Sequence, residues 1–345
     1  MKYKRRDFTR QTTPTGLSRR DLLSAIIASG AGGVALTARS VAATTRDLET
    51  TRIRLPSTRG ICGAPMYAAD ELLRAEGFTD VQYVKVKTPY HIEDALASGD
   101  ADLSVTYGLR WVYRLDSGIP VTVVAGIHPG CNELFVTDRI RSLRDLHGRT
   151  IAIGELGGLS HQLLSMVLAY IGLDWRNDVK VEEHSSSDEI RLLGEGKIDA
   201  LLAFPPELRA RKIGHVLLDT GRDRPWSQYF CSMLAANRNF HRKHPVAMKR
   251  AVHAILKAAD MCSQEPDRVA RQLMDRQFTA NYDYARTTLR ELDYRAWRNL
   301  EPEETIRFYA LRMRETGFIK STPQKLISVG TDWRILKELR AELKS

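Results

Sequence analysis

The chain has 345 residues, of which 43% are hydrophobic and 27% are charged, a composition typical of globular proteins. Its length favours two compact units rather than one. The net charge of +10 would suit a nucleic-acid-binding protein, but residues 1–43 hold eight basic and two acidic residues, and the remainder carries a net charge of only +4. No stripe of alternating basic and aromatic residues is present, so we predict no nucleic-acid partner.

Residues 1–43 have the three-part order of an export signal: a basic region, a small apolar region over 25–38, and the small residues Ser40-Val-Ala-Ala43. Ser18-Arg-Arg-Asp-Leu-Leu23 resembles the twin-arginine export motif, and Arg5-Arg-Asp-Phe8 is a weaker second copy. The apolar region is too short and too rich in glycine for a good membrane span. We therefore predict a twin-arginine signal peptide over 1–43 and no stable membrane insertion after its removal. A disordered basic tail is the alternative.

Four cysteines are present, Cys62, Cys131, Cys231 and Cys262. An oxidising compartment would permit three full pairings, among which the sequence does not choose. No spacing gives CxxC, so neither a zinc site nor a redox site is indicated. Free buried cysteines are the expected state.

After residue 44, short apolar strands alternate with helical segments, which favours an α/β fold with a mainly parallel sheet. A first set has strands expected at 53–55, 81–86, 102–106 and 121–125, with helices at 64–76, 91–98 and 109–116. A second set has strands expected at 150–153, 179–182 and 200–203, with helices at 160–171 and 188–193.

The two sets resemble each other at a period near 95 residues. Leu96, Gly99 and Asp102 match Leu193, Gly196 and Asp199, while Gly77 and Val84-Lys-Val86 match Gly172 and Val179-Lys-Val181. This repeat predicts two similar α/β lobes, each opening with a strand, a glycine turn and a helix. Two such turns facing each other would line a cleft with helix N-termini, which favour anions. Chance similarity between βαβ units is the alternative.

The glycine turn of the second set, Gly154 to His161, follows the apolar run 150–153. Its glycines allow backbone conformations that a Cβ would obstruct. We expect Ser160 to cap the following helix and Gly172 to end it. Leu164, Val167 and Leu168 lie on one face of that helix.

Two connecting segments, 127–136 and 226–235, are expected to be extended and to act as paired hinge strands between the lobes. The rest of the chain is expected to be helical, over 245–262, 266–274, 284–292, 302–316 and 333–343. Three of these helices begin at a proline, which is favoured in the first helical turn. His241 and His244 are expected in an exposed basic turn rather than at a metal.

Four segments carry a family resemblance: Gly63-Ala-Pro-Met-Tyr-Ala-Ala69, Leu96-Ala-Ser-Gly-Asp-Ala-Asp102, Arg141-Ser-Leu-Arg-Asp-Leu-His-Gly148 and Gly196-Lys-Ile-Asp-Ala200. Over residues 52–276 the chain resembles periplasmic substrate-binding proteins of the nitrate/sulfonate/taurine ABC-transporter type. That superfamily also includes thiamine-pyrimidine precursor binders. The resemblance implies a periplasmic-binding-protein-like α/β fold, in which two α/β lobes are joined by two crossover segments and followed by a helical C-terminal region.

With this resemblance we predict lobe 1 over 44–127, lobe 2 over 128–229, and a return crossover to lobe 1 with C-terminal helices over 230–345. The implied function is that of a periplasmic solute-binding protein. It would enclose a small organic or inorganic anion or a small heterocycle and deliver it to an ABC permease in the inner membrane. No cofactor is implied.

The candidate ligand-binding residues lie in strand-end turns and crossovers. They are Cys62, Gly63, Thr106, Tyr107, Cys131, Gly158, Ser160, His161, Phe204 and Trp226. A hydroxyl and an imidazole at a helix start can hold a carboxylate, a sulfonate or a ring acceptor. Strand ends of open α/β sheets bind ligands, and an aromatic ring can stack on a planar one. Helix capping, core packing, hinge packing and, for the cysteines, a disulfide are the alternatives.

Catalytic patterns are missing: the glycine turn lacks the Lys-Ser/Thr of a phosphate-binding loop, and neither HExxH nor GxSxG occurs. We therefore predict a protein that is not an enzyme and has no catalytic or metal-binding residues. Two alternatives are kept. One is a pyrimidine-synthase-like enzyme in which His161 or a cysteine takes part, and the other is a ligand-binding partner of a membrane sensor.

Overall fold

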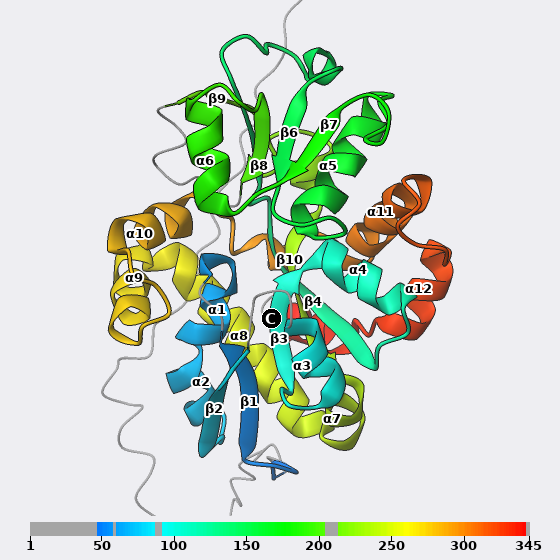
Figure 1. Cartoon of the computed structure of the whole chain (residues 1–345). Helices are drawn as coiled ribbons and strands as arrows, with labels where there is room; N and C mark the ends of the chain where they lie inside the picture. Colours follow the sequence, from blue (N-terminus) through cyan, green and yellow to red (C-terminus); the bar gives the residue numbers. More distant parts are fainter. Residues whose placement is uncertain (1–46, 58–59, 87–91, 204–212, 343–345) are drawn as a thin grey trace, which may run out of the picture. The chain divides into compact units, whose positions relative to one another are not determined.

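A computed structural model describes residues 47–57, 60–86, 92–203 and 213–342 (Figure 1). These residues belong to the unit formed by Arg46–Ser345, and the description below is limited to it. The predicted signal peptide lies outside the described residues. Among the helices of the described ranges, none combines the length and the apolar character that a membrane span needs.

The first set opens with strand β1 (Arg52–Ser57), which pairs in parallel with β2 (Asp80–Lys85). Between them lie the short helix η1 (Ile61–Gly63), α1 (Ala64–Ala68) and α2 (Asp70–Ala75). The single helix expected over 64–76 is therefore divided at Ala69. Gly77 follows with φ +103°, a conformation that favours glycine and ends the helical segment as expected.

The first set continues with α3 (Ile92–Ser98), β3 (Leu103–Tyr107), α4 (Gly108–Asp116) and β4 (Val121–Pro129). A later strand, β10 (Phe230–Asn237), lies between β3 and β4 and is antiparallel to both. The prediction of a mainly parallel sheet is wrong here. The reason is that β10 returns from the second set and therefore runs opposite to its neighbours.

The second set forms a five-stranded sheet in the order β7-β6-β8-β5-β9. Its strands are β5 (Glu133–Val136), β6 (Thr150–Ile153), β7 (Lys180–Glu183), β8 (Ala200–Ala203) and β9 (His215–Asp219). Strand β6 is parallel to β7 and β8, whereas β5 is antiparallel to β8 and β9. Helices α5 (Leu159–Tyr170) and α6 (Ser186–Gly194) complete the set.

The predicted repeat is visible in the hydrogen bonds of two aspartates. The Asp102 backbone N–H donates to the Arg54 carbonyl at 2.8 Å, and the Arg54 N–H donates to the Asp102 carboxylate at 2.8 Å. In the second set the Asp199 N–H donates to the Thr150 carbonyl at 2.8 Å, and the Thr150 N–H donates to the Asp199 carboxylate at 3.1 Å. Asp102 thus ties the start of β3 to β1, and Asp199 ties the start of β8 to β6.

The C-terminal region is helical, as predicted. Its helices are α7 (Arg238–Lys243), α8 (Pro245–Gln264), α9 (Pro266–Asp275), α10 (Tyr282–Glu291), α11 (Pro302–Glu315), α12 (Pro323–Gly330) and α13 (Arg334–Glu342). Helix α8 packs on α1 and α2 of the first set and on α9, whereas α11 contacts both α4 and α5 (Figure 1). The second large core therefore includes side chains from both sets and from α11.

The expected exposed basic turn around His241 is instead part of helix α7. The His241 Nε2 atom lies 2.9 Å from an oxygen of Asp332, and both side chains are largely buried. Asn237 caps the helix by accepting hydrogen bonds from the backbone N–H groups of Asn239 and Phe240. The charged sequence hid this helix because its buried contacts come from a segment more than ninety residues away.

Candidate functional site at the crossovers

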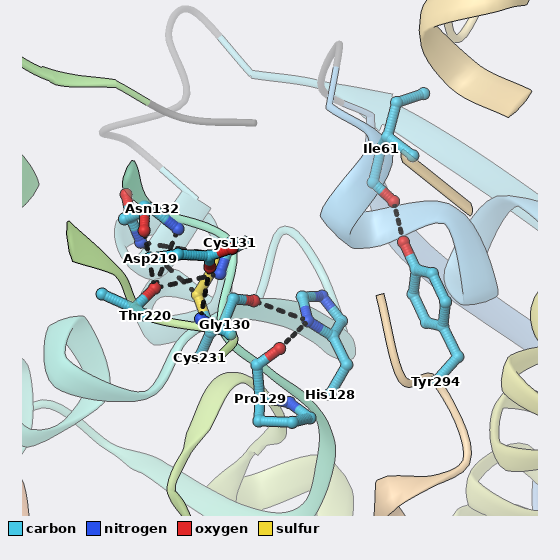
Figure 2. Close-up of a disulfide and its surroundings, with 11 residues drawn as sticks. Ile61, His128, Pro129, Gly130, Cys131, Asn132, Asp219, Thr220, Cys231 and Tyr294 are labelled. Carbon is cyan, nitrogen blue, oxygen red and sulfur yellow. Dashed lines mark hydrogen bonds between the residues drawn. A yellow bond between two sulfur atoms is a disulfide. The ribbon is translucent and has the colours of Figure 1, made fainter. Parts of the chain in front are cut away.

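Three of the four cysteines lie together where the two sets are connected. Cys131, between β4 and β5, forms a disulfide with Cys231 of β10 (Figure 2). Cys62 of η1 is buried in the same cluster, against which Tyr107 and Leu292 pack. The prediction of free cysteines is therefore wrong for Cys131 and Cys231. Their pairing arises because β10 lies alongside the end of β4, which brings residues 100 positions apart into contact.

The Thr220 hydroxyl fixes the backbone next to the disulfide. It accepts hydrogen bonds from the Cys131 N–H at 3.2 Å and the Asn132 N–H at 3.0 Å, and it donates to the Asn132 carbonyl at 2.9 Å. The Asn132 side-chain amide donates to the sulfurs of both Cys131 and Cys231 at 3.6 Å (Figure 2). The first crossover is thus attached to the end of β9 and to the start of β10.

His128 lies near the end of β4, just before the first crossover, and is fully buried. Its Nδ1–H donates to the carbonyls of Pro129 at 3.1 Å and Gly130 at 3.2 Å (Figure 2). Its ring meets the Tyr294 ring edge-on at 4.8 Å, and the Tyr294 hydroxyl donates to the Ile61 carbonyl at 2.6 Å. Burial lowers the pKa of His128 from 6.5 to about 4, against the opposing effect of the neighbouring carbonyls.

Because His128 is buried as a neutral ring, we expect the free energy of unfolding to fall in acid. Well above pH 6.5 the imidazole is neutral, without its second proton, in both the folded and the unfolded state. As the pH falls toward 4, the unfolded chain binds the proton first, and the free energy of unfolding decreases. We expect His128 to contribute a loss of about 2 kcal/mol between about pH 7 and pH 5.

Urea denaturation of the wild type and of His128→Phe at both pH values measures this loss. Other groups titrate in the same range, so the difference between the two proteins isolates the imidazole. Equal pH dependence of the two proteins would contradict the prediction.

The backbone of Gly130, in the first crossover, lies very close to the backbone of Gly221. Its φ is +57°, and a Cβ at this position would meet the Gly221 Cα at 2.0 Å. Gly130→Ala should therefore lower the free energy of unfolding by about 2 kcal/mol or more, because backbone must move. Gly118→Ala is the matched control, with φ +79° and open space around it, and should cost only about 1 kcal/mol. Equal urea midpoints for the two variants would contradict the prediction that the backbone contact makes Gly130→Ala the more damaging change.

The structure brings together some of the predicted site residues. Cys62 and Cys131 belong, with Cys231, to one buried cluster, called the sulfur cluster below, and Tyr107 packs against it. Gly63 is the N-cap of α1, and Thr106 is buried on β3 opposite Met233 of β10. These residues come from a strand-end turn, a strand end and a crossover, which are far apart in sequence.

Gly158, Ser160 and His161 form a second group at the start of α5. The helix is capped by Gly158, so the expectation that Ser160 is the cap is wrong. The extended backbone of Gly158 begins the helix early, and the Ser160 hydroxyl accepts a hydrogen bond from the Gly154 N–H at 3.1 Å. His161 accepts at Nδ1 from the Gly157 N–H at 2.8 Å.

The His161 imidazole is held among aromatic rings. It packs edge-on against Trp175 at 4.1 Å and Phe318 at 5.2 Å, and it is 3% exposed. Burial is the largest cause that lowers its pKa, and the nearby Arg176 charge adds to it. The neutral ring therefore stabilises the glycine turn by accepting the hydrogen bond from the Gly157 N–H.

Arg110 connects the two sets and was missed by sequence reasoning. Its guanidinium donates to the Gly157 carbonyl of the glycine turn at 3.4 Å, and the Gln162 amide donates to the same oxygen at 2.9 Å. Arg110 also pairs with Glu93 at 3.2 Å, with side chains 12% and 2% exposed. Its position in the first turn of the helix that follows β3 is the one sequence signal that could have singled it out.

The family model described as NMT1/THI5 like matches residues 64–269, more than half of the chain. The chain belongs to the NMT1/THI5-like family. No curated protein matches it. The sulfur cluster lies only partly inside the matched range, because Cys62 precedes it.

Solved structures share the fold of this NMT1/THI5-like chain. The periplasmic nitrate-binding protein NrtA from Synechocystis PCC 6803 is 14% identical over 86% of this chain and 89% of its own, with a TM-score of 0.69. The periplasmic aliphatic sulphonate binding protein SsuA from Escherichia coli is 18% identical over 80% and 91%, with a TM-score of 0.65.

A third structure is described as having the generic periplasmic binding protein fold. This Candida albicans CA3427 gene product is 9% identical over 81% of this chain and 96% of its own, with a TM-score of 0.63. The predicted periplasmic-binding-protein-like fold is thereby confirmed.

One predicted site residue of this NMT1/THI5-like chain, Trp226, lies apart from both groups. Trp226 is 3% exposed and packs edge-on against Phe308 of α11 at 5.5 Å and Tyr170 at 6.1 Å. This is the hinge-packing arrangement considered above. Phe204 lies outside the described residues. Within the described part of the chain, no three metal-ligating side chains are grouped.

Proposed function

We propose that this NMT1/THI5-like chain is the solute-binding component of an ABC importer. It would work in the periplasm, enclose a small anion or small heterocycle between two α/β lobes, and deliver it to a permease in the inner membrane. One observation carries the proposal: a duplicated α/β unit joined by two crossovers, in a fold shared with nitrate- and sulphonate-binding proteins.

In this proposal lobe 1 comprises 44–127 together with 230–345, and lobe 2 comprises 128–229. The crossovers between β4 and β5 and between β9 and β10 are then the hinge. The disulfide and the Thr220 hydrogen bonds lie at that hinge. Binding would favour the closed form to the extent that the ligand gains contacts there.

Arg110 supports an anionic ligand. It lies at the strand end of lobe 1 and already contacts the carbonyl of Gly157 in lobe 2. A guanidinium can bind a nitrate, sulfonate or carboxylate through two parallel hydrogen bonds. Glu93 is 2% exposed and accepts a hydrogen bond from the guanidinium Nε at 3.2 Å, which fixes its orientation. The proposed ligand-facing turns include Gly63, Thr106 and Tyr107 of lobe 1, together with Gly158 and Ser160 of lobe 2. Arg110 contacts the Gly157 carbonyl in the second of these turns.

A thermal-unfolding screen of the exported protein tests the function. The panel should contain nitrate, alkanesulfonates, amino-sulfonates, carboxylates and pyrimidines. A true ligand at 100 times its dissociation constant should add about 2.7 kcal/mol to the free energy of unfolding. A panel in which no compound raises the melting temperature would contradict the proposal.

Two arginine variants refine the screen. Arg110→Gln should abolish the response to anions, since it removes the guanidinium beside Gly157. Arg114→Gln is the matched control, one helical turn away, where the arginine pairs with the half-exposed Asp94. Equal loss of binding in both variants would contradict the role given to Arg110.

Export by the twin-arginine route is part of the proposal. Replacing both Arg19 and Arg20 by lysine should keep the precursor in the cytoplasm. Fractionation of cells that express each form measures this. Normal export of the lysine form would exclude that route.

A further inference from the structure

The sulfur cluster contains one more cysteine than the disulfide requires. Cys62 is 6% exposed and shares the cluster with Cys131 and Cys231, which are 6% and 7% exposed. The other free thiol, Cys262, lies in the core of the first set on α8 and is not a member of this cluster. The described chain therefore carries a free thiol packed against a disulfide and a second free thiol outside that cluster.

Two buried residues lie close to Cys62 and to the disulfide. The Cys62 thiol interacts with the side chain of Ser232, the residue that follows Cys231. The backbone of Cys62 also interacts with the buried His128, which is hydrogen-bonded to the carbonyl of Gly130, the residue before Cys131. Cys62 is thus next to residues of both β4 and β10.

We propose that Cys62, Cys131 and Cys231 form an intramolecular thiol–disulfide exchange site. In the exchange, the Cys62 thiol loses its proton and its sulfur attacks one sulfur of the Cys131–Cys231 bond. A bond forms between Cys62 and the attacked sulfur, the Cys131–Cys231 bond breaks, and the released sulfur takes the electron pair and then a proton. One thiol and one disulfide are present before and after, so no oxidant or reductant is needed.

Asn132 can donate a hydrogen bond to the sulfur that is released in the exchange. Its amide donates to the sulfurs of both Cys131 and Cys231 at 3.6 Å. A hydrogen bond to a sulfur stabilises the thiolate form, whichever of the two cysteines leaves. Burial, in contrast, raises the pKa of the Cys62 thiol, which keeps it protonated and keeps the exchange slow near neutral pH.

The exchange would change what the covalent link connects. In the structure the disulfide joins the two crossovers to each other. After exchange it would join one crossover to η1, the turn that precedes α1. This goes beyond the proposed function and does not depend on the identity of any ligand, so a failed ligand screen leaves it standing.

Disulfide mapping of the full exported chain tests the exchange. The protein is held at about pH 7.5 and about pH 9.5, quenched with acid, alkylated and digested. Peptides that link Cys62 to Cys131 or Cys231 should form about tenfold faster for each pH unit, as the thiolate fraction rises. Cys262→Ala is the matched control and should behave like the wild type. Only the Cys131–Cys231 link at pH 9.5, or equal linkage of Cys262, would overturn the proposal.

A variant tests whether Cys62 lies within bonding reach. Cys131→Ser leaves Cys62, Cys231 and Cys262, and treatment with oxidised glutathione should link the first two. Alkylation of the denatured product should then find one free thiol, whereas three free or glutathione-capped thiols would overturn the proposal. Near-ultraviolet circular dichroism checks that the variant is folded, and Cys231→Ser, expected to link Cys62 to Cys131, replaces it if it is not. The proposal requires the results of both experiments.

Discussion

Replacing both Cys131 and Cys231 by alanine should lower the free energy of unfolding by about 4 kcal/mol. The disulfide closes a loop with a sequence separation of 100, and a link of this length removes much of the conformational freedom of the unfolded chain. Both cysteines are replaced so that Cys62 has no partner. Guanidinium denaturation followed by circular dichroism gives the change in midpoint.

Cys262→Ala is the matched control for this variant, because it removes a buried sulfur that is not part of a disulfide. It should cost about 1 kcal/mol, the loss expected for a small core truncation. A dithiothreitol titration of the wild type should reproduce the effect of the double variant. A double variant as stable as the wild type would show that the link between the crossovers contributes nothing to the fold.

Asp102→Ala should lower the free energy of unfolding by about 3 kcal/mol, since one member of a largely buried ion pair is removed. The Asp102 carboxylate accepts from the Arg54 N–H at 2.8 Å and from its guanidinium at 2.6 and 3.2 Å. Its side chain is 5% exposed, whereas that of Arg54 is 28% exposed. The substitution leaves the Arg54 backbone N–H and the Arg54 guanidinium without this carboxylate, at the contact between β1 and β3.

The equivalent residue of the repeat is the natural comparison. Asp199 also accepts from a strand N–H, that of Thr150 at 3.1 Å, but its ion-pair partner Arg139 is 55% exposed. Asp199→Ala should therefore cost only about 1 kcal/mol, because water replaces most of what is lost. Urea denaturation of both variants compares them. A larger loss for Asp199→Ala would contradict the ranking by burial.

Much of the two repeated sets could be predicted because their signals are local. Thr150–Ile153 and Ala200–Ala203 are short apolar runs bounded by turn residues, and both strands form with the expected bounds. Gly77 and Gly172 adopt positive φ, which few other residues do readily, and they end their helices where expected. Neither signal depends on a distant contact.

Other elements could not be predicted, because their pairing partners are distant. For β5 the sequence predicts only that 127–136 is extended, and the pairing of β5 with β8 and β9 on its two sides is set by those distant strands. Helix α12 likewise has a weak pattern of its own, and it is held by α11, α4 and β4. Such segments take their structure from neighbours rather than from propensity.

The candidate site shows the same division. Sequence spacing placed Cys62, Tyr107 and Cys131 at strand ends and crossovers, where the structure brings them together. It did not give Cys231 as their neighbour, and it did not identify Arg110. Both omissions concern contacts between sets, and one of them depends on the return of β10 along β4.

The four segments of family resemblance indicated the periplasmic-binding-protein-like fold, and the sequence by itself determined the doubled α/β unit and the helical C-terminal region. Hydrophobic period, turn glycines and the paired Asp102 and Asp199 carry that information within segments of a few tens of residues. Only the tertiary structure decided the antiparallel place of β10 and the pairing of Cys131 with Cys231. The physical reason is that a strand's neighbours and a cysteine's partner are set by which surfaces of the whole chain become buried together.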